Sequence, residues 1–143
     1  MPYQNLSPAK AKELLDGADG WTYVDVRTEG EFAKGHPPHA RNVPLAIGTL
    51  SQMQLNLEFL AVMKANFKKD ARLVLGCASG PRSSKACEIL VNAGYSTLVN
   101  MSSGFMGSRD AFGQVEKGWS ALGLPVEMHA KPDQTYDQLR RNV

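Results

Sequence analysis

The residue of this sequence best placed to do chemistry is Cys77, which begins the run Cys77-Ala78-Ser79-Gly80-Pro81-Arg82. The apolar residues 72–76 before it predict a buried strand, and residues 82–93 after it predict a helix that ends at Gly94. A cysteine at a helix start faces unpaired N–H groups and the positive end of the helix dipole, which both favour the thiolate. Because Arg82 adds a positive charge, we predict a nucleophile in a site that accepts a small anion.

The residues that follow Cys77 predict a cradle of hydrogen-bond donors. Gly80 can adopt a positive φ where the chain curls, whereas Pro81 has no N–H, so the cradle has one donor fewer. The residues expected to contact a bound anion, or a terminal sulfur on Cys77, are Ala78, Ser79, Gly80, Arg82 and Ser83.

The second cysteine, Cys87, shares a helical face with Ala86 and Leu90, which predicts a packing role. The helix places it about 7.5 Å along the axis beyond Arg82, so we expect no disulfide with Cys77. Two cysteines are too few for a disulfide framework or a set of four metal ligands, and we predict no metal site.

The segments around Cys77 alternate between strands and helices. Apolar and β-branched runs predict strands at residues 21–26, 40–44, 72–76 and 97–99, and helical spacings predict helices at residues 9–15, 51–67 and 82–93. Ser7 caps the first helix, and Thr28 and Glu31 form a capping box for a short one. This order predicts an α/β domain with a mainly parallel central sheet of about five strands, helices on both faces, and ligands at the carboxyl ends of strands.

Length and composition exclude several classes of protein. A chain of 143 residues with 43% hydrophobic and 21% charged residues fits one globular domain. The net charge of +2 is evenly spread, so we expect no nucleic-acid partner. Because the sequence has no apolar leader and no stretch of 18 apolar residues, we expect a cytoplasmic protein with no membrane partner.

Seven motifs in order resemble those of the rhodanese family, and they run from about Ser7 to Val126. They are Asp25-Val26-Arg27, Glu31-Phe32, Gly35-His36, Asn42-Val43-Pro44, Cys77-x-x-Gly80-x-Arg82-Ser83, Gly94-Tyr95 and Gly123-Leu124-Pro125-Val126. The resemblance implies a single rhodanese-like domain over residues 1–126. Residues 127–143 are expected to form a polar tail, in which Tyr136 and Leu139 either make an amphipathic turn or fray.

The resemblance also implies an activity, the transfer of sulfane sulfur from a small anionic donor such as thiosulfate to a thiophile. The thiophile would be cyanide or a thiol, with glutathione and thioredoxin as candidates. Cys77 would accept the sulfur and hold it as a persulfide, a covalent intermediate that requires no metal or organic cofactor.

Some positions depart from the family pattern. Gly76 stands where many members have an aromatic residue, and residues 78–81 are neutral where members often carry charge, so weak use of thiosulfate is expected. Trp119 lies 15 residues after Gly104 instead of a few, so residues 105–118 are an insertion near the active site. We hypothesise that Arg109 in this insertion attracts anions to a pocket wall; the alternative is a solvated turn.

Other charged residues are expected to support the loop. Asp25, Arg27 and Glu31 are expected to pair among themselves or with Arg82. His36 and His39 are expected in an exposed loop, and neither is assigned a role as a base.

Two other functions remain open. Cysteine-dependent phosphatases and arsenate reductases also place a thiolate and an arginine at a helix start, but they use Cys-x5-Arg, and this chain has Cys-x4-Arg. The other alternative is a non-catalytic or redox-sensing rhodanese-like module that carries sulfur or binds a partner. The presence of Cys77 argues against that alternative, although the neutral loop suits a sulfur carrier.

Overall fold

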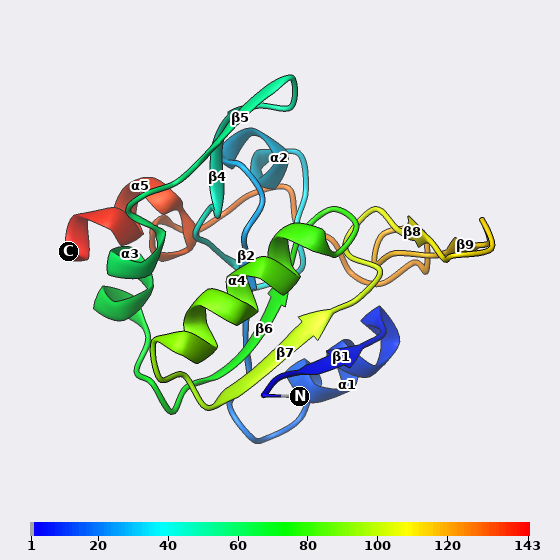
Figure 1. Cartoon of the computed structure of the whole chain (residues 1–143), viewed down its shortest axis with the longest axis horizontal. Helices are drawn as coiled ribbons and strands as arrows, with labels where there is room; N and C mark the ends of the chain where they lie inside the picture. The colour runs from blue at the N-terminus through cyan, green and yellow to red at the C-terminus, as the bar shows by residue number, and fades with distance from the viewer. Residues whose placement is uncertain (1) are drawn as a thin grey trace.

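A computed structural model, which describes residues 2–143, contains a five-stranded parallel sheet with helices on both faces (Figure 1). The strands lie in the order β1 (Gln4–Leu6), β7 (Thr97–Met101), β6 (Arg72–Gly76), β2 (Thr22–Asp25) and β3 (Arg41–Asn42). Each neighbouring pair is parallel. The predicted fold class is therefore confirmed, although the edge strand β1 was not predicted.

Alternate residues of the central strand β6 face two separate hydrophobic cores, because successive side chains of a strand point to opposite faces. Leu73 and Leu75 belong to the core beneath α3 (Phe59–Asn66), α4 (Pro81–Asn92) and α5 (Tyr136–Leu139). Val74 belongs to the core beneath α1 (Pro8–Asp16) and α2 (Glu29–Ala33). Cys77 follows β6 directly, so it lies at the carboxyl edge of the sheet and faces the first core.

The helix boundaries follow the predicted capping residues. Ser7 accepts a hydrogen bond from the Lys10 N–H at the start of α1, and both bonds of the Thr28–Glu31 capping box are present at the start of α2. The helix α4 ends just before Gly94, which has a φ of +98°. Local sequence signals therefore set the ends of these elements.

The prediction of one helix over residues 51–67 is wrong. Residues Ala46–Thr49 (β4) and Gln52–Leu55 (β5) form an antiparallel hairpin, and α3 begins only at Phe59. Buried Asn56 separates the two elements, because its side-chain amide donates to the Pro44 carbonyl and its side-chain oxygen accepts from the Glu58 N–H. These bonds fix a turn where a continuous helix would have to pass.

Residues 127–143 pack against the domain through a 3-10 turn (Pro132–Gln134), α5 and a second 3-10 turn (Arg140–Asn142). Tyr136 and Leu139 are buried in the first core. Gln134 adds a hydrogen bond from its side-chain amide to the Ala40 carbonyl, at 3.0 Å. The amphipathic turn therefore forms, and its apolar side chains are not frayed.

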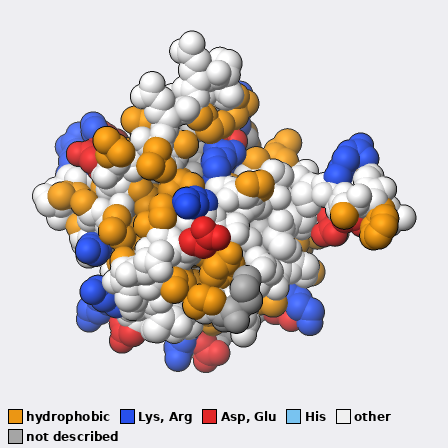
Figure 2. Space-filling view, viewed as in Figure 1, with side chains coloured by type: hydrophobic (Ala, Val, Ile, Leu, Met, Phe, Trp, Pro, Cys, Tyr) orange, Lys and Arg blue, Asp and Glu red, His pale blue; other side chains and the backbone are white. Residues whose placement is uncertain are grey.

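Residues 105–118 contain a second hairpin, formed by β8 (Ser108–Arg109) and β9 (Val115–Glu116). This hairpin stands away from the body in both the ribbon and the space-filling views (Figures 1 and 2). Among residues 2–143, no helix has the length and apolar character needed to span a membrane.

Candidate active site

Cys77 lies in a curled loop between β6 and α4, with its side chain 1% exposed. The Gly80 N–H donates to its Sγ at 3.1 Å, and the Ser83 hydroxyl lies 3.4 Å from the same atom. Gly80 has a φ of +118°, and a Cβ there would lie 2.5 Å from the Ser102 carbonyl oxygen. Glycine is therefore required at this position both by the backbone conformation and by the close approach of the next loop.

The other predicted loop residues surround this pair of donors. Ala78 is partly buried, Ser79 is exposed, and no side chain of residues 2–143 caps the start of α4. The N–H groups of its first turn, including those of Arg82 and Ser83, therefore face the loop without a side-chain partner. This arrangement can stabilise negative charge on Cys77 or on an atom bound to it.

The segment that follows β7 supports the loop from behind through its main chain. The Phe105 N–H donates to the Cys77 carbonyl and the Met106 N–H donates to the Ala78 carbonyl, both at 2.8 Å. At Gly104 a Cβ would lie 2.5 Å from the Ala78 carbonyl oxygen, so the two chain segments are in direct contact. Phe105 and Met106 thus hold the loop in place.

Arg82 is paired with Glu31, as the sequence led us to expect. Its two terminal nitrogens donate to the two carboxylate oxygens at 2.6 and 3.0 Å, and the hydrogen bond to Glu31 raises the pKa of Arg82. Burial alone would raise the pKa of Glu31, but hydrogen bonds from Arg82 and the Thr28 backbone outweigh it and lower that pKa. Glu31 therefore compensates most of the charge of the only cation within the predicted loop.

Asp25 and Arg27 form a second, buried ion pair with 2.7 Å between Arg27 Nη2 and Asp25 Oδ2. Burial alone would lower the pKa of Arg27, but the Asp25 charge and its hydrogen bond outweigh this and raise it. Arg27 also donates to the Gly35 carbonyl and lies 4.3 Å from the centre of the Phe105 ring. The pair thereby ties the end of β2 to the segment that backs the Cys77 loop.

Arg109, His36 and His39 lie apart from the Sγ donors. Arg109 is exposed on the β8–β9 hairpin and donates to the Gly113 carbonyl at 2.9 Å, so it bonds within its own turn. The prediction of an exposed His36 is wrong: its ring is buried and stacks on Phe32 with 3.9 Å between ring centres. His39 is exposed, as expected.

Tyr23 explains why glycine precedes Cys77, a relationship the sequence analysis missed. A Cβ at Gly76 would lie 1.7 Å from the Tyr23 hydroxyl oxygen, so the phenol occupies that space. Tyr23 and Gly76 belong to neighbouring strands, since β2 and β6 pair with Asp25 opposite Gly76. Sequence order alone does not reveal this contact, because it depends on strand register.

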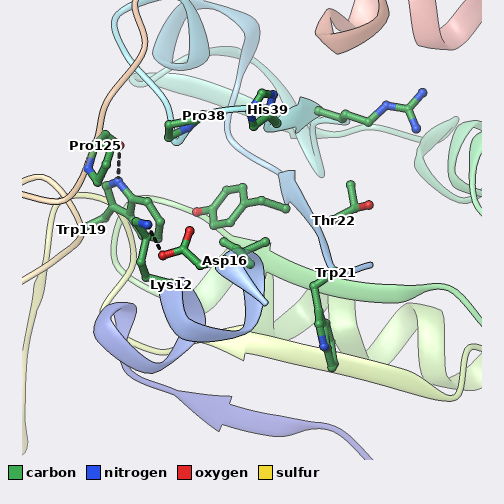
Figure 3. A pocket seen from close by; sticks show the side chains of 11 residues that line it. Lys12, Asp16, Trp21, Thr22, Pro38, His39, Trp119 and Pro125 are labelled. Carbon is green, nitrogen blue, oxygen red and sulfur yellow. Dashed lines mark hydrogen bonds and ion pairs between the residues drawn. The ribbon is translucent and has the colours of Figure 1, made fainter. Parts of the chain in front are cut away.

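Tyr23 also forms part of a pocket of about 270 Å³ on the α1 side of the sheet (Figure 3). Lys12 and Asp16 of α1 form an ion pair at its edge, and the Trp119 indole N–H donates to the Pro125 carbonyl at 2.7 Å. Cys77 does not line this pocket. Cys77 and the aromatic pocket thus lie on opposite faces of the sheet.

Comparison with known proteins identifies the family of the chain. The sequence model of the family described as Rhodanese-like domain matches residues 7–111. The chain belongs to the rhodanese-like family. Its relatives include proteins named as thiosulfate sulfurtransferases, which supports membership of the sulfurtransferase family.

Two of the curated relatives from Arabidopsis thaliana differ in how much of their length this chain covers. Thiosulfate sulfurtransferase 16, chloroplastic, is 33% identical over 123 residues, covering 86% of this chain and 92% of the relative. Protein HIGH ARSENIC CONTENT 1, mitochondrial, is 40% identical over 92 residues, covering 64% of this chain but only 54% of the relative. The chain thus matches about half the length of the latter protein. Since these names indicate organelles, a cytoplasmic location stays a prediction.

A solved structure of similar size shows the same fold. The crystal structure of Rv0390 from M. tuberculosis has a TM-score of 0.73 with this chain at 31% sequence identity. The match covers 89% of this chain and 99% of that chain. The fold therefore extends over nearly all of a protein of comparable length.

Proposed function

We propose that this protein is a sulfurtransferase that carries sulfane sulfur as a persulfide on Cys77. The observation that carries the proposal is the Gly80 N–H, which donates to Cys77 Sγ at 3.1 Å at the start of α4. A hydrogen bond to sulfur is strongest when the sulfur is negatively charged, so this geometry favours the thiolate that attacks. In the persulfide the charge lies on the terminal sulfur, for which the uncapped N–H groups at the start of α4 are available.

The proposed cycle has two displacements at sulfur. The Cys77 thiolate attacks the outer sulfur of the donor, a new S–S bond forms, and the donor's own S–S bond breaks. The bonding electrons leave with the donor fragment, which is sulfite when the donor is thiosulfate. A thiolate or cyanide then attacks the terminal sulfur and the Cys77 thiolate leaves, so the cycle needs no metal or organic cofactor.

The charge around the loop favours a donor with low charge. Thiosulfate is a dianion, whereas Ala78 and Ser79 are neutral and Glu31 compensates Arg82. The reacting group of an organic persulfide has one negative charge, and any further charges lie away from the sulfur, so less compensation is needed beside Cys77. We therefore propose a thiol-derived persulfide as the preferred donor, with a thiol such as glutathione or a thioredoxin as the acceptor.

Intact-mass spectrometry tests the proposal directly. The protein is treated with thiosulfate or with glutathione persulfide, and we expect the mass of one sulfur atom to be added to the wild type and to Cys87→Ala. The variant Cys77→Ala should gain none. A wild-type chain that takes up no sulfur from either donor would overturn the sulfurtransferase proposal.

A second candidate activity is arsenate reduction, since Cys77 and Arg82 lie at the start of α4 and one relative is named HIGH ARSENIC CONTENT 1. In this activity the Cys77 thiolate would displace water from arsenate and form an S–As bond. Glutathione would then attack Cys77 Sγ, so that the S–As bonding electrons leave with arsenic as As(III), and a second glutathione would reduce the resulting mixed disulfide. Arsenite formation in the presence of glutathione measures this activity, with Cys77→Ala as the control. If no arsenite forms above that control, this candidate is excluded.

A further inference from the structure

Three polar side chains connect the sulfur of Cys77 to the edge strand of the sheet. Ser83 of α4 has its hydroxyl oxygen 3.4 Å from Cys77 Sγ and 2.5 Å from Asn100 Oδ1. Asn100 of β7 donates from Nδ2 to Asn5 Oδ1 of β1 at 2.9 Å. Ser83 and Asn100 are buried, whereas Asn5 is exposed. A continuous path of polar contacts therefore runs from solvent at β1 to the sulfur.

The Ser83 hydroxyl has one proton and three acceptors within reach. These acceptors are Cys77 Sγ, Asn100 Oδ1 and the Gly80 carbonyl oxygen, the last at 3.0 Å. In the orientation with Oδ1 toward Ser83, Asn100 competes for the proton that the sulfur would otherwise receive. A charged sulfur therefore gains this donor only if Asn100 stops accepting from it.

Rotation of the Asn100 amide group by 180° removes this competition, because it exchanges the positions of Oδ1 and Nδ2 while the rest of the side chain stays in place. Its Nδ2 then donates to the Ser83 oxygen, and the Ser83 proton is free to point at the sulfur. Asn5 lies directly opposite Asn100 in the register of β1 and β7, so a matching half-turn of its amide donates to the Asn100 oxygen. The buried amide of Asn100 thus keeps hydrogen-bond partners in both orientations.

We propose that Asn100 and Asn5 are positioning residues that direct the Ser83 hydroxyl to the anionic sulfur of Cys77. The inference rests on the proposed role of Cys77 as the nucleophile. It also assigns a replacement for the donor that Pro81 cannot supply, because the Ser83 hydroxyl takes the place of a missing N–H. The negative charge to be stabilised is that of the thiolate and then of the terminal persulfide sulfur.

The test is the pH profile of Cys77 alkylation by iodoacetamide, followed by peptide mass spectrometry. The variant Asn100→Leu keeps a side chain of similar size but has no amide to donate to the Ser83 oxygen. The Ser83 proton is then left to the Gly80 carbonyl oxygen, which at 3.0 Å is nearer than the sulfur at 3.4 Å. We expect the midpoint of its profile to rise by about one pH unit, so that alkylation at neutral pH slows about tenfold. The variant Asn5→Ala removes only the exposed end of the path and should slow alkylation about twofold to threefold.

Matched serine variants separate this role from a general effect on folding. Ser83→Ala should shift the profile as Asn100→Leu does, and the double variant should shift it no further, because both changes remove the same hydrogen bond. Ser84→Ala should leave the profile unchanged, since the Ser84 hydroxyl bonds to the Tyr3 hydroxyl instead. If Asn100→Leu does not fold, Asn5→Ala and Ser83→Ala still test the path.

The proposal is overturned if Asn100→Leu or Ser83→Ala gives the wild-type profile, or if their shifts add in the double variant. Alkylation does not require sulfur transfer, so its outcome is independent of the proposed function. A shifted profile in a protein that takes up no sulfur would support the path and refute the sulfurtransferase. A wild-type profile in variants that load sulfur would do the reverse.

Discussion

The two cysteines of this chain are equally hidden from solvent, yet their surroundings differ. Cys77 is 1% exposed and Cys87 is 0% exposed, both in the core beneath α4. Cys77 Sγ receives the Gly80 N–H and lies beside the Ser83 hydroxyl. Burial, followed by the nearby charge of Cys77, raises the pKa of Cys87 to about 12. Polar donors at the sulfur, rather than exposure, therefore distinguish Cys77 from the packed Cys87.

The largest expected difference between the two thiols is in sulfur transfer itself. Replacing Cys77 by alanine should lower the rate of thiocyanate formation from a persulfide donor and cyanide by about 10³-fold or more, because no covalent intermediate can form. Cys87→Ala should keep the rate within about threefold of the wild type. Equal losses in both variants would show that the two sulfurs act together.

The second difference is in stability at high pH. The pKa of Cys87 is raised from its ordinary value of 9.0 to about 12 in the folded chain, so only the unfolded chain loses this proton between those values. The free energy of unfolding should therefore fall as pH rises through this window, by up to about 4 kcal/mol. Urea unfolding of the wild type and of Cys87→Ala at several pH values measures it. Cys87→Ala lacks this thiol, so its free energy of unfolding should fall less steeply with pH than that of the wild type. Equal slopes in the two proteins would contradict the prediction.

The third difference is in the hydrogen-bond donors to the sulfur, which Cys77 has and Cys87 lacks among residues 2–143. Gly80→Ala places a Cβ 2.5 Å from the Ser102 carbonyl oxygen at a positive φ, so we expect the free energy of unfolding to fall by about 2 kcal/mol. Alkylation of Cys77 at neutral pH should also slow, while Cys87 stays unreactive.

Gly30→Ala is the control for that substitution. Its Cβ would have only the Thr28 hydroxyl oxygen within contact distance, at 4.0 Å, on the exposed side of α2. We expect its free energy of unfolding, measured by thermal unfolding, to match that of the wild type within about 0.5 kcal/mol. A Gly80→Ala variant as stable as this control would show that the loop tolerates a side chain.

The smallest expected effect concerns the charge beside Cys77. Glu31→Gln should cost about 1 kcal/mol of stability at neutral pH, because the ion pair with Arg82 is only partly buried. The pKa of Glu31 is lowered in the folded chain, so its contribution is present above the unfolded value and is lost as pH falls through the folded one.

Glu31→Gln should also change the preference between the two sulfur donors. With Arg82 released, kcat/KM for thiosulfate should rise about threefold to tenfold relative to that for glutathione persulfide. Glu88→Gln removes the carboxylate of an exposed pair with Lys85, 3.8 Å apart, and should change neither stability nor donor preference measurably. An unchanged preference in Glu31→Gln would argue against charge as the basis of donor choice.

Features set by residues close in sequence could be predicted from the sequence. The strand, loop and helix around Cys77 are consecutive, and their apolar spacing, Gly80 and Pro81 indicate the turn. The Thr28–Glu31 capping box is local in the same way. Packing of Cys87 followed from the helical face that it shares with Leu90. These signals need no knowledge of which strands are neighbours.

Features set by strand pairing or by competing local structure could not be predicted in this way. The phenol of Tyr23 beneath Gly76 and the bond between Asn5 and Asn100 depend on the register of strands distant in sequence. The β4–β5 hairpin was missed because Leu55 fits the helical spacing of Phe59 and Met63, although it is exposed in the structure.

Residues 105–118 are joined to the Cys77 loop by two hydrogen bonds of the main chain, from the N–H groups of Phe105 and Met106. Such bonds form with any residue except proline at the donor position. Beyond them the β8–β9 hairpin leads away from the body (Figure 1). Substitutions, insertions and fused segments at the hairpin tip should therefore be tolerated, which makes it a suitable attachment point for a label or a second domain.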